Sequence, residues 1–122
     1  MALTVVEGTL AFSSTTTVIT VGPETALSLF QFAINQTPMG AGDNVNVSVQ
    51  RKDSGGTMYE VDNYTLSPPV AIPAAPGQGY VPLEDGRWYA NPYGGLQFVC
   101  TYTLASGNTT YPSLYYDLTQ GF

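Results

Sequence analysis

Residues 44–50 constrain the fold most, because valine occupies every second position of this segment and polar residues occupy the positions between. A period of two is typical of a β-strand with one buried and one solvent-facing side. Turn-forming residues bound the segment on both sides, at 40–43 and at 53–56. Residues 57–66 alternate again, so we expect these two segments to form an antiparallel hairpin.

Further strands are predicted on both sides of this hairpin. Thr- and Val-rich residues 3–12 and 15–21 precede it, and the apolar segment 26–34 is predicted as a strand, with one or two helical turns as its alternative. After the hairpin, residues 96–104 and 109–118 flank a turn and predict a second hairpin.

These elements predict an all-β fold, an antiparallel two-sheet β-sandwich of about seven or eight short strands, either immunoglobulin-like or jelly-roll-like. A small barrel is the second choice. A chain of 122 residues suits a single domain over residues 1–122. The Pro- and Gly-rich residues 67–95 are expected to form a long extended loop, which favours a contact surface there.

Composition argues against several classes of function. The chain has no histidine, so histidine-dependent triads and the usual zinc sites cannot be built. Its net charge of −6, with Arg51, Lys52 and Arg87 as its only cations, argues against nucleic acid and anionic membranes as partners. Cys100 lies in an apolar segment and is expected in the core. A hydrolase built on carboxylates such as Glu84 and Asp85 remains as an alternative, but we expect no enzyme activity and no cofactor.

Four carboxylates, those of Asp43, Asp53, Glu60 and Asp62, raise the question of a calcium site. No loop places oxygen ligands at every second position, as calcium-binding loops do. We therefore predict that these side chains are solvated and that the protein holds no metal ion.

Several short features follow one another along the chain. They are Val-Glu-Gly-Thr-Leu at 6–10, Phe30-Gln31-Phe32, Gly42-Asp43, Gly55-Gly56 and a closing segment 97–118 around Ser106-Gly107. Their order resembles that of the small β-sandwich decoration, or cement, proteins of tailed-bacteriophage capsids. The resemblance extends over the whole chain, and the sequence departs from the pattern in the Pro- and Tyr-rich residues 68–93.

The resemblance implies a structural protein that performs no chemistry. Such a protein is made in the host cytoplasm, binds the major capsid protein on the outer surface of the virion and stabilises the particle. It implies a homo-oligomer, with a trimer favoured.

Aromatic and apolar residues outside the alternating strands are candidates for the interface. Loop aromatics either anchor an interface, close the end of the core or stack on a sugar. The N-terminal segment either pairs with a neighbouring chain or forms an ordinary edge strand, and the C-terminal segment docks either on its own core or on a partner. The candidates are Leu3, Val5, Tyr80, Trp88, Tyr89, Tyr93, Tyr115, Tyr116 and Phe122.

A second hypothesis is a carbohydrate- or receptor-binding adhesion module of a tail, fibre or spike. In that case Trp88, Tyr89 and Tyr93 would form a stacking platform, with Asn91 and Asp85 as polar partners.

Overall fold

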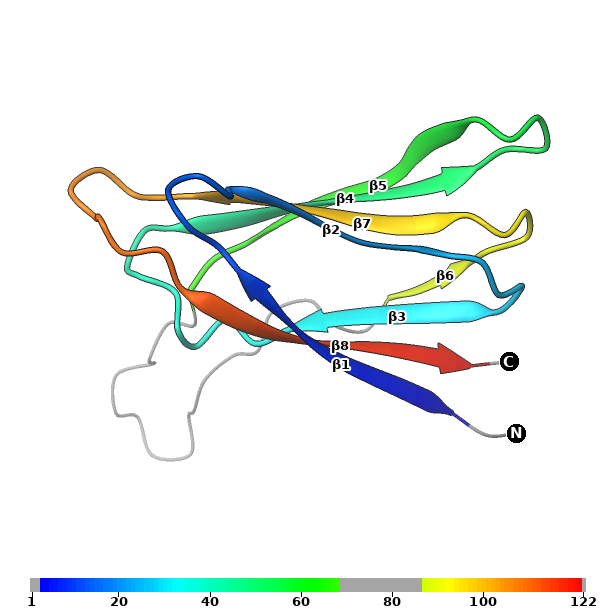
Figure 1. Cartoon of the computed structure of the whole chain (residues 1–122), viewed down its shortest axis with the longest axis horizontal. Helices are drawn as coiled ribbons and strands as arrows, with labels where there is room; N and C mark the ends of the chain where they lie inside the picture. Colours follow the sequence, from blue (N-terminus) through cyan, green and yellow to red (C-terminus); the bar gives the residue numbers. More distant parts are fainter. Residues whose placement is uncertain (1–2, 69–86, 122) are drawn as a thin grey trace, which may run out of the picture.

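A computed structural model of the chain describes residues 3–68 and 87–121 (Figure 1). In these ranges the chain forms strands and no helix, which confirms the all-β prediction. The strands are β1 (Thr4–Ala11), β2 (Val18–Glu24), β3 (Leu29–Ile34), β4 (Asn44–Lys52), β5 (Met58–Leu66), β6 (Trp88–Ala90), β7 (Leu96–Thr103) and β8 (Ser113–Gly121).

The strands of the described residues form two four-stranded sheets, and every pairing in them is antiparallel. One sheet has the order β1-β8-β3-β6 and the other has the order β2-β7-β4-β5. The sheets face each other in two layers (Figure 1), which confirms the predicted sandwich. The chain changes sheet at every connection except the one between β4 and β5. This strand order is that of an eight-stranded jelly roll.

The two predicted hairpins have different outcomes. Strands β4 and β5 pair from Val45↔Leu66 to Lys52↔Met58, which confirms the first hairpin. The second is wrong, because β7 pairs with β2 and β4 whereas β8 pairs with β1 and β3 in the other sheet. The expected turn does form, with the Asn108 N–H donating to the Ala105 carbonyl at 3.0 Å. The residues after that turn carry the chain across the end of the sandwich to the other sheet instead of back along β7.

The core lies between the sheets and is built from alternate residues of their strands. Val45, Val47 and Val49 are all 0% exposed, as their period of two predicts. In β3, Phe30 and Phe32 face the same core, and the ring of Phe32 stacks on that of Phe98 at 4.5 Å. Segment 29–34 is therefore the predicted strand and not its helical alternative. Cys100 is fully buried, as predicted.

A buried carboxylate closes one end of the sandwich and corrects the prediction that Asp43 is solvated. Asp43 is 1% exposed. It accepts hydrogen bonds from the Ala105 N–H at 2.7 Å, from the Asn108 amide at 2.8 Å and from the Tyr102 hydroxyl. Gly42 makes the preceding turn possible, since its φ of +82° lies in the left-handed region that favours glycine. The network ties the β3–β4 connection to the β7–β8 connection.

The other three carboxylates considered for calcium differ in burial. Asp53 and Glu60 are exposed, as predicted. Asp53 caps the β4–β5 turn by accepting from the backbone N–H groups of Gly55 and Thr57 at 2.8 and 3.0 Å. Asp62 is partly buried and faces the space between the sheets, so the prediction of a solvated side chain is wrong for it as well.

Candidate functional site

Large apolar side chains are exposed on the outer face of the β1-β8-β3-β6 sheet. Phe30 and Phe32 of β3 point into the core. Leu29 is the neighbour of Phe30 along the strand and therefore points to the outer face. Val5 of β1 and Trp88 of β6 are outward positions of one row, which runs across the sheet through Thr119. The exposed fractions are 60% for Leu3, 53% for Val5, 40% for Leu29 and 44% for Trp88. We call these four residues the outer apolar patch.

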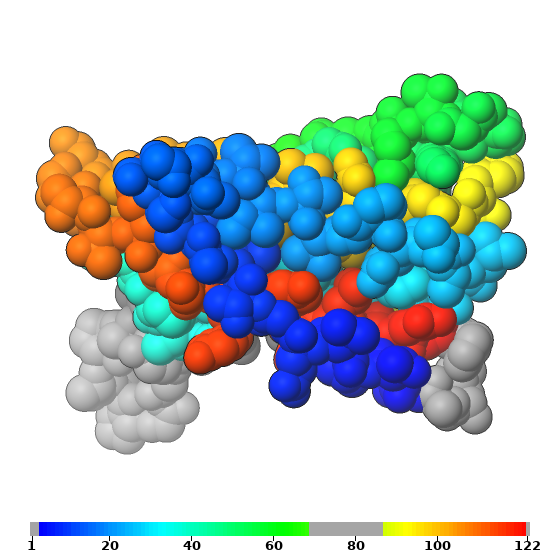
Figure 2. Space-filling model, in the orientation of Figure 1, coloured from blue at the N-terminus to red at the C-terminus, as the bar shows by residue number. Residues whose placement is uncertain are grey.

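Gly121 joins the two sides of this patch. Strand β8 lies between β1 and β3. A Cβ atom at Gly121 would lie 3.1 Å from Leu3 Cδ2 and 3.2 Å from Trp88 Cζ3. Both side chains therefore lean over the glycine, one from each side, and form a continuous apolar surface. In Figure 2 the first strand (blue) and the last strand (red) lie side by side.

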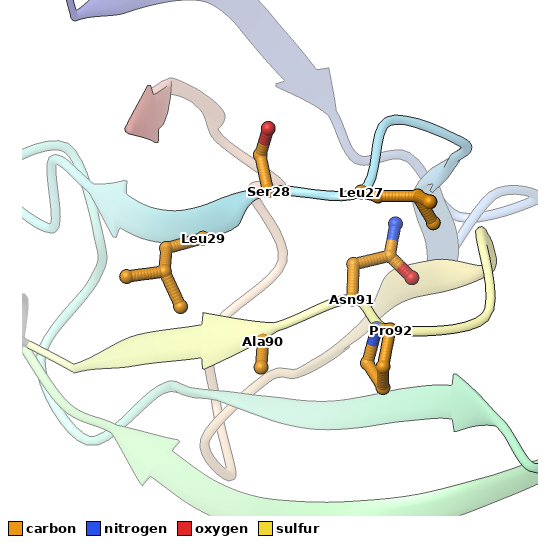
Figure 3. A pocket seen from close by; sticks show the side chains of 6 residues that line it. All are labelled: Leu27, Ser28, Leu29, Ala90, Asn91 and Pro92. Atoms are coloured by element: carbon orange, nitrogen blue, oxygen red, sulfur yellow. The ribbon is translucent and has the colours of Figure 1, made fainter. Parts of the chain in front are cut away.

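A shallow groove of about 380 Å³ borders the patch (Figure 3). One wall is Leu27, which precedes β3, together with Leu29 at the start of β3. The other wall is Ala90 at the end of β6 together with Pro92, which follows it. Asn91 holds these two walls together. Its amide nitrogen donates to the carbonyls of residues 24 and 26 at 2.8 and 2.9 Å, and its amide oxygen accepts from the N–H of residue 95 at 2.8 Å.

The same outer face carries two acidic side chains beside the patch. Glu7 of β1 lies directly opposite Asp117 of β8, and both side chains are exposed. Like charges opposite each other in a sheet destabilise it slightly. The ion pair that the described residues contain lies elsewhere, between Arg87 and Asp62. Among the described residues neither of these two carboxylates forms an ion pair, so an acidic pair lies next to the exposed apolar surface.

Tyr89 lies on the opposite face of β6 from Trp88, so the structure separates two residues that the sequence placed in one cluster. The Tyr89 ring meets Phe98 edge-on at 5.9 Å. Its hydroxyl donates to Asp62 Oδ2 at 2.7 Å, and the Arg87 guanidinium contacts the same oxygen at 2.7 Å. Tyr89 thus closes the core and ties β6 of one sheet to β5 of the other.

This polar contact shifts the pKa values of both partners. The hydrogen bond from Tyr89 lowers the pKa of Asp62, against the effect of burial, and Arg87 lowers it further. Burial raises the pKa of Tyr89, and the hydrogen bond to Asp62 adds to that rise. The pair therefore remains a neutral phenol bound to a carboxylate across the ordinary pH range.

The other predicted interface residues are scattered. Tyr93 is 55% exposed in the turn after β6, and Tyr115 is 66% exposed on the acidic part of the outer face. Tyr116 is partly buried, with its ring against Gly8 and Phe32. Tyr80, Asp85 and Phe122 lie outside the described residues. The predicted loop 67–95 is interrupted, because its described part includes strand β6.

Sequence reasoning missed Leu27 and Leu29 as candidates for the site. Leu27 is 73% exposed, which is more than any residue of the outer apolar patch. The signal was available in the segment 26–34, where Phe30, Phe32 and Ile34 already fill one side of a strand and leave Leu29 to the other.

The outer face of the second sheet has a different chemistry. Its polar side chains bond one another in a continuous network, which includes Ser48 Oγ to Glu60 Oε2 at 2.5 Å and Asn46 Nδ2 to Asn63 Oδ1 at 2.8 Å. These contacts lower the pKa of Glu60, with the Ser48 hydrogen bond as the largest cause. The members of the network are Asn46, Ser48, Gln50, Glu60, Asn63, Thr65 and Gln97.

Within the described ranges, no three cysteine or acidic side chains come together in a group that could hold a metal ion. The same ranges contain no helix of the length and apolarity needed to cross a membrane. Comparison of the chain with known protein families, curated proteins and solved structures found no match. The class of the protein is therefore given by its strand order, that of an eight-stranded jelly roll.

Proposed function

We propose that the protein is a non-enzymatic decoration protein of a tailed-phage capsid. It binds the major capsid protein on the outer surface of the virion and stabilises the particle. The observation that carries the proposal is the outer apolar patch, whose side chains are 40–60% exposed on a single sheet face. Large exposed apolar patches on soluble domains commonly mark sites of protein–protein contact.

The patch has the properties of a docking surface. Trp88 belongs to one of the residue types that are enriched among the side chains that dominate binding energy. Three of the four patch residues, Val5, Leu29 and Trp88, lie on paired strands, so little conformational entropy is lost when a partner contacts them. On an assembled shell the same contact is repeated by symmetry, and modest affinity at each site can give strong retention.

The fold and the charge also support a structural role. Jelly rolls are common in viral capsid and lectin domains, although a fold alone does not define a function. A chain of net charge −6 with three cations has little affinity for a packaged genome. The carboxylates of Asp43, Glu60 and Asp62 have lowered pKa values, whereas a catalytic general acid needs a raised one.

The test is quantitative mass spectrometry of particles purified from the source, which we expect to contain the protein in a fixed, high ratio to the coat protein. Two variants sharpen the test. Leu29→Lys places a charge in the outer apolar patch, and Thr101→Lys places the same charge on the outer face of the other sheet. We expect Leu29→Lys to be lost from particles and Thr101→Lys to be retained. Absence of the natural protein from particles would rule out the structural role, and a handful of copies would favour a tail, fibre or spike.

A receptor- or carbohydrate-binding module is the second candidate, favoured by the position of Trp88 next to the groove of about 380 Å³. The expected platform is not assembled, because Tyr89 faces the core and the Asn91 amide is fully bonded to backbone groups. Glycan titration monitored by the fluorescence of Trp88 separates the two proposals. Saturable quenching that Trp88→Ala abolishes in a folded protein would favour the carbohydrate module.

A further inference from the structure

The free edges of the two sheets differ in how well they are protected against pairing with another strand. Native proteins protect such edges with short strands, bulges, prolines and charges. In the described part of the chain, β6 has only three residues, β2 contains Pro23 and a register shift between Val21 and Glu24, and β5 carries Glu60 and Asp62. Strand β1 is eight residues long, pairs with β8 without a bulge and carries Glu7 as its single charge.

The first half of β1 is apolar and exposed on both of its faces. Val5 points to the outer face and is 53% exposed. Val6 is on the same side of the strand as Leu10, which is 0% exposed in the core, and yet Val6 is also 53% exposed. The start of β1 therefore extends beyond the cover of the second sheet. Figure 1 shows β1 at the margin of the molecule with the chain's N-terminus at its outer end.

We propose that β1 pairs with β1 of a second copy in an antiparallel arrangement, so that the two β1-β8-β3-β6 sheets join into one continuous sheet. The strand that pairs with β1 belongs to a second copy of the chain. The other described edges are protected, so the unprotected edge that a second copy offers to β1 is its own β1. A pairing of identical edges is related by a twofold axis and closes at two chains. This geometry gives a dimer, whereas the resemblance noted in the sequence favours a trimer.

Charge excludes a register centred nearer Glu7, and the register centred on Val5 is the nearest one that keeps the two Glu7 carboxylates apart. A twofold axis at Val5 places Val5 opposite Val5 of the second copy, Thr4 opposite Val6, and Leu3 opposite Glu7. The two Glu7 residues are then four residues apart, about 14 Å along the strand direction. That separation exceeds the screening length of about 8–10 Å at physiological ionic strength. The neighbouring register, centred on Val6, would bring them to about 7 Å.

The dimer extends the proposed function without depending on it. Leu3 and Val5 border the twofold axis, so the outer apolar patches of the two copies become one surface across the joined sheets. If this surface docks on coat subunits, each dimer presents two linked patches, and the second contact forms at high effective concentration. This consequence rests on the proposed function, whereas the pairing of β1 strands does not.

A charge-exchange experiment on the full chain tests the pairing. Sedimentation equilibrium of the natural protein should give the mass of a dimer. Val5→Lys or Val5→Glu puts like charges directly opposite each other at the axis, and each variant alone should dimerise at least about tenfold more weakly. An equimolar mixture of the two should recover a one-to-one heterodimer, because lysine then faces glutamate. Loss of folding cannot produce this recovery.

Leu29→Lys is the matched control, since it lies two strands away from the edge in the same patch. It should remain dimeric while being lost from particles, so that failure of dimerisation and failure of coat docking are distinguished. A natural protein that is monomeric up to about 1 mM would overturn the inference. A trimer, or charge variants at Val5 that dimerise as well as the natural chain, would overturn it as well. Recovery by a Val6→Lys and Val6→Glu mixture in place of the Val5 mixture would overturn the assigned register.

Discussion

Replacing Asp43 by alanine should destabilise the fold more than any other single change to a carboxylate among the described residues. The side chain is 1% exposed and accepts hydrogen bonds from Tyr102, Ala105 and Asn108. A hydrogen bond to a charged group contributes about 1.5–3 kcal/mol, and donors left without a partner in a buried site lose more than the bond itself. Water molecules can accept some of the hydrogen bonds that the carboxylate accepted. We therefore expect Asp43→Ala to lower the free energy of unfolding by about 3–5 kcal/mol. Domains of this size are stable by only about 5–15 kcal/mol.

Urea denaturation followed by far-ultraviolet circular dichroism measures this loss at neutral pH. Asp43→Asn retains one carbonyl acceptor and should cost about half as much. Asp117→Asn is the control, because Asp117 is exposed and faces Glu7 across the strands, so its neutralisation should change stability by less than about 0.5 kcal/mol. A loss below about 1 kcal/mol for Asp43→Ala would refute the conclusion that this carboxylate holds the two connections together.

The same network gives a pH dependence with a definite sign. Burial acts to raise the pKa of Asp43, but the hydrogen bonds from Ala105, Tyr102 and Asn108 outweigh it and hold the pKa below the ordinary value of 3.8. The folded state therefore binds the proton less readily than the unfolded state. The stabilisation is fully present above about pH 4 and is lost as the pH falls through the lowered pKa. Asp43→Asn should show a shallower loss of stability below pH 4 than the natural protein.

Three further changes test the packing. Gly8→Ala should cost about 1–3 kcal/mol in urea denaturation, because the new Cβ atom would lie 2.3 Å from Cζ of Tyr116, and a smaller residue at 116 should relieve most of the loss. Cys100 should not react with a thiol reagent in the native protein, since it is fully buried and burial raises its pKa to about 12, and should react once urea unfolds the chain. Asp62→Asn should cost about 1–2 kcal/mol and lower the pKa of Tyr89 in a spectrophotometric titration, because the phenol then no longer donates to a carboxylate.

Most strands of this fold were predictable from the sequence, with β6 as the exception, but apart from the β4–β5 pairing their partners were not. The alternation in β4 is local information, because each valine is buried and each polar neighbour is partly exposed. The turn at 105–108 has the residues of a hairpin turn, and nothing in its composition shows that the chain then crosses to the other sheet. The position of β8 between β1 and β3 depends on contacts with residues about one hundred positions earlier. A short-range pattern contains no information on such contacts.

The site was predictable in the same partial way. Leu3, Val5 and Trp88 were candidates from sequence, and the structure places them on one outer face. Tyr89 was grouped with Trp88 because residues 88–90 were assigned to a loop. Once they form a strand, neighbouring side chains point to opposite faces. Asp43 was expected in solvent because it follows a Gly-Ala-Gly turn, and its three hydrogen-bond donors come from residues about sixty positions away.

The size of the outer apolar patch explains why a single copy would bind a partner weakly. Full burial of a large apolar side chain contributes about 1.5–3 kcal/mol, and each patch residue is 40–60% exposed, so each has about 1 kcal/mol left to gain. Four such residues give about 4 kcal/mol, which is at the lower end of the 4–15 kcal/mol estimated cost of association. A dimer joined through β1 would double the gain while that cost is incurred once. Stable attachment through this face therefore requires either the second copy or further contacts, such as basic side chains of the partner at Glu7 and Asp117.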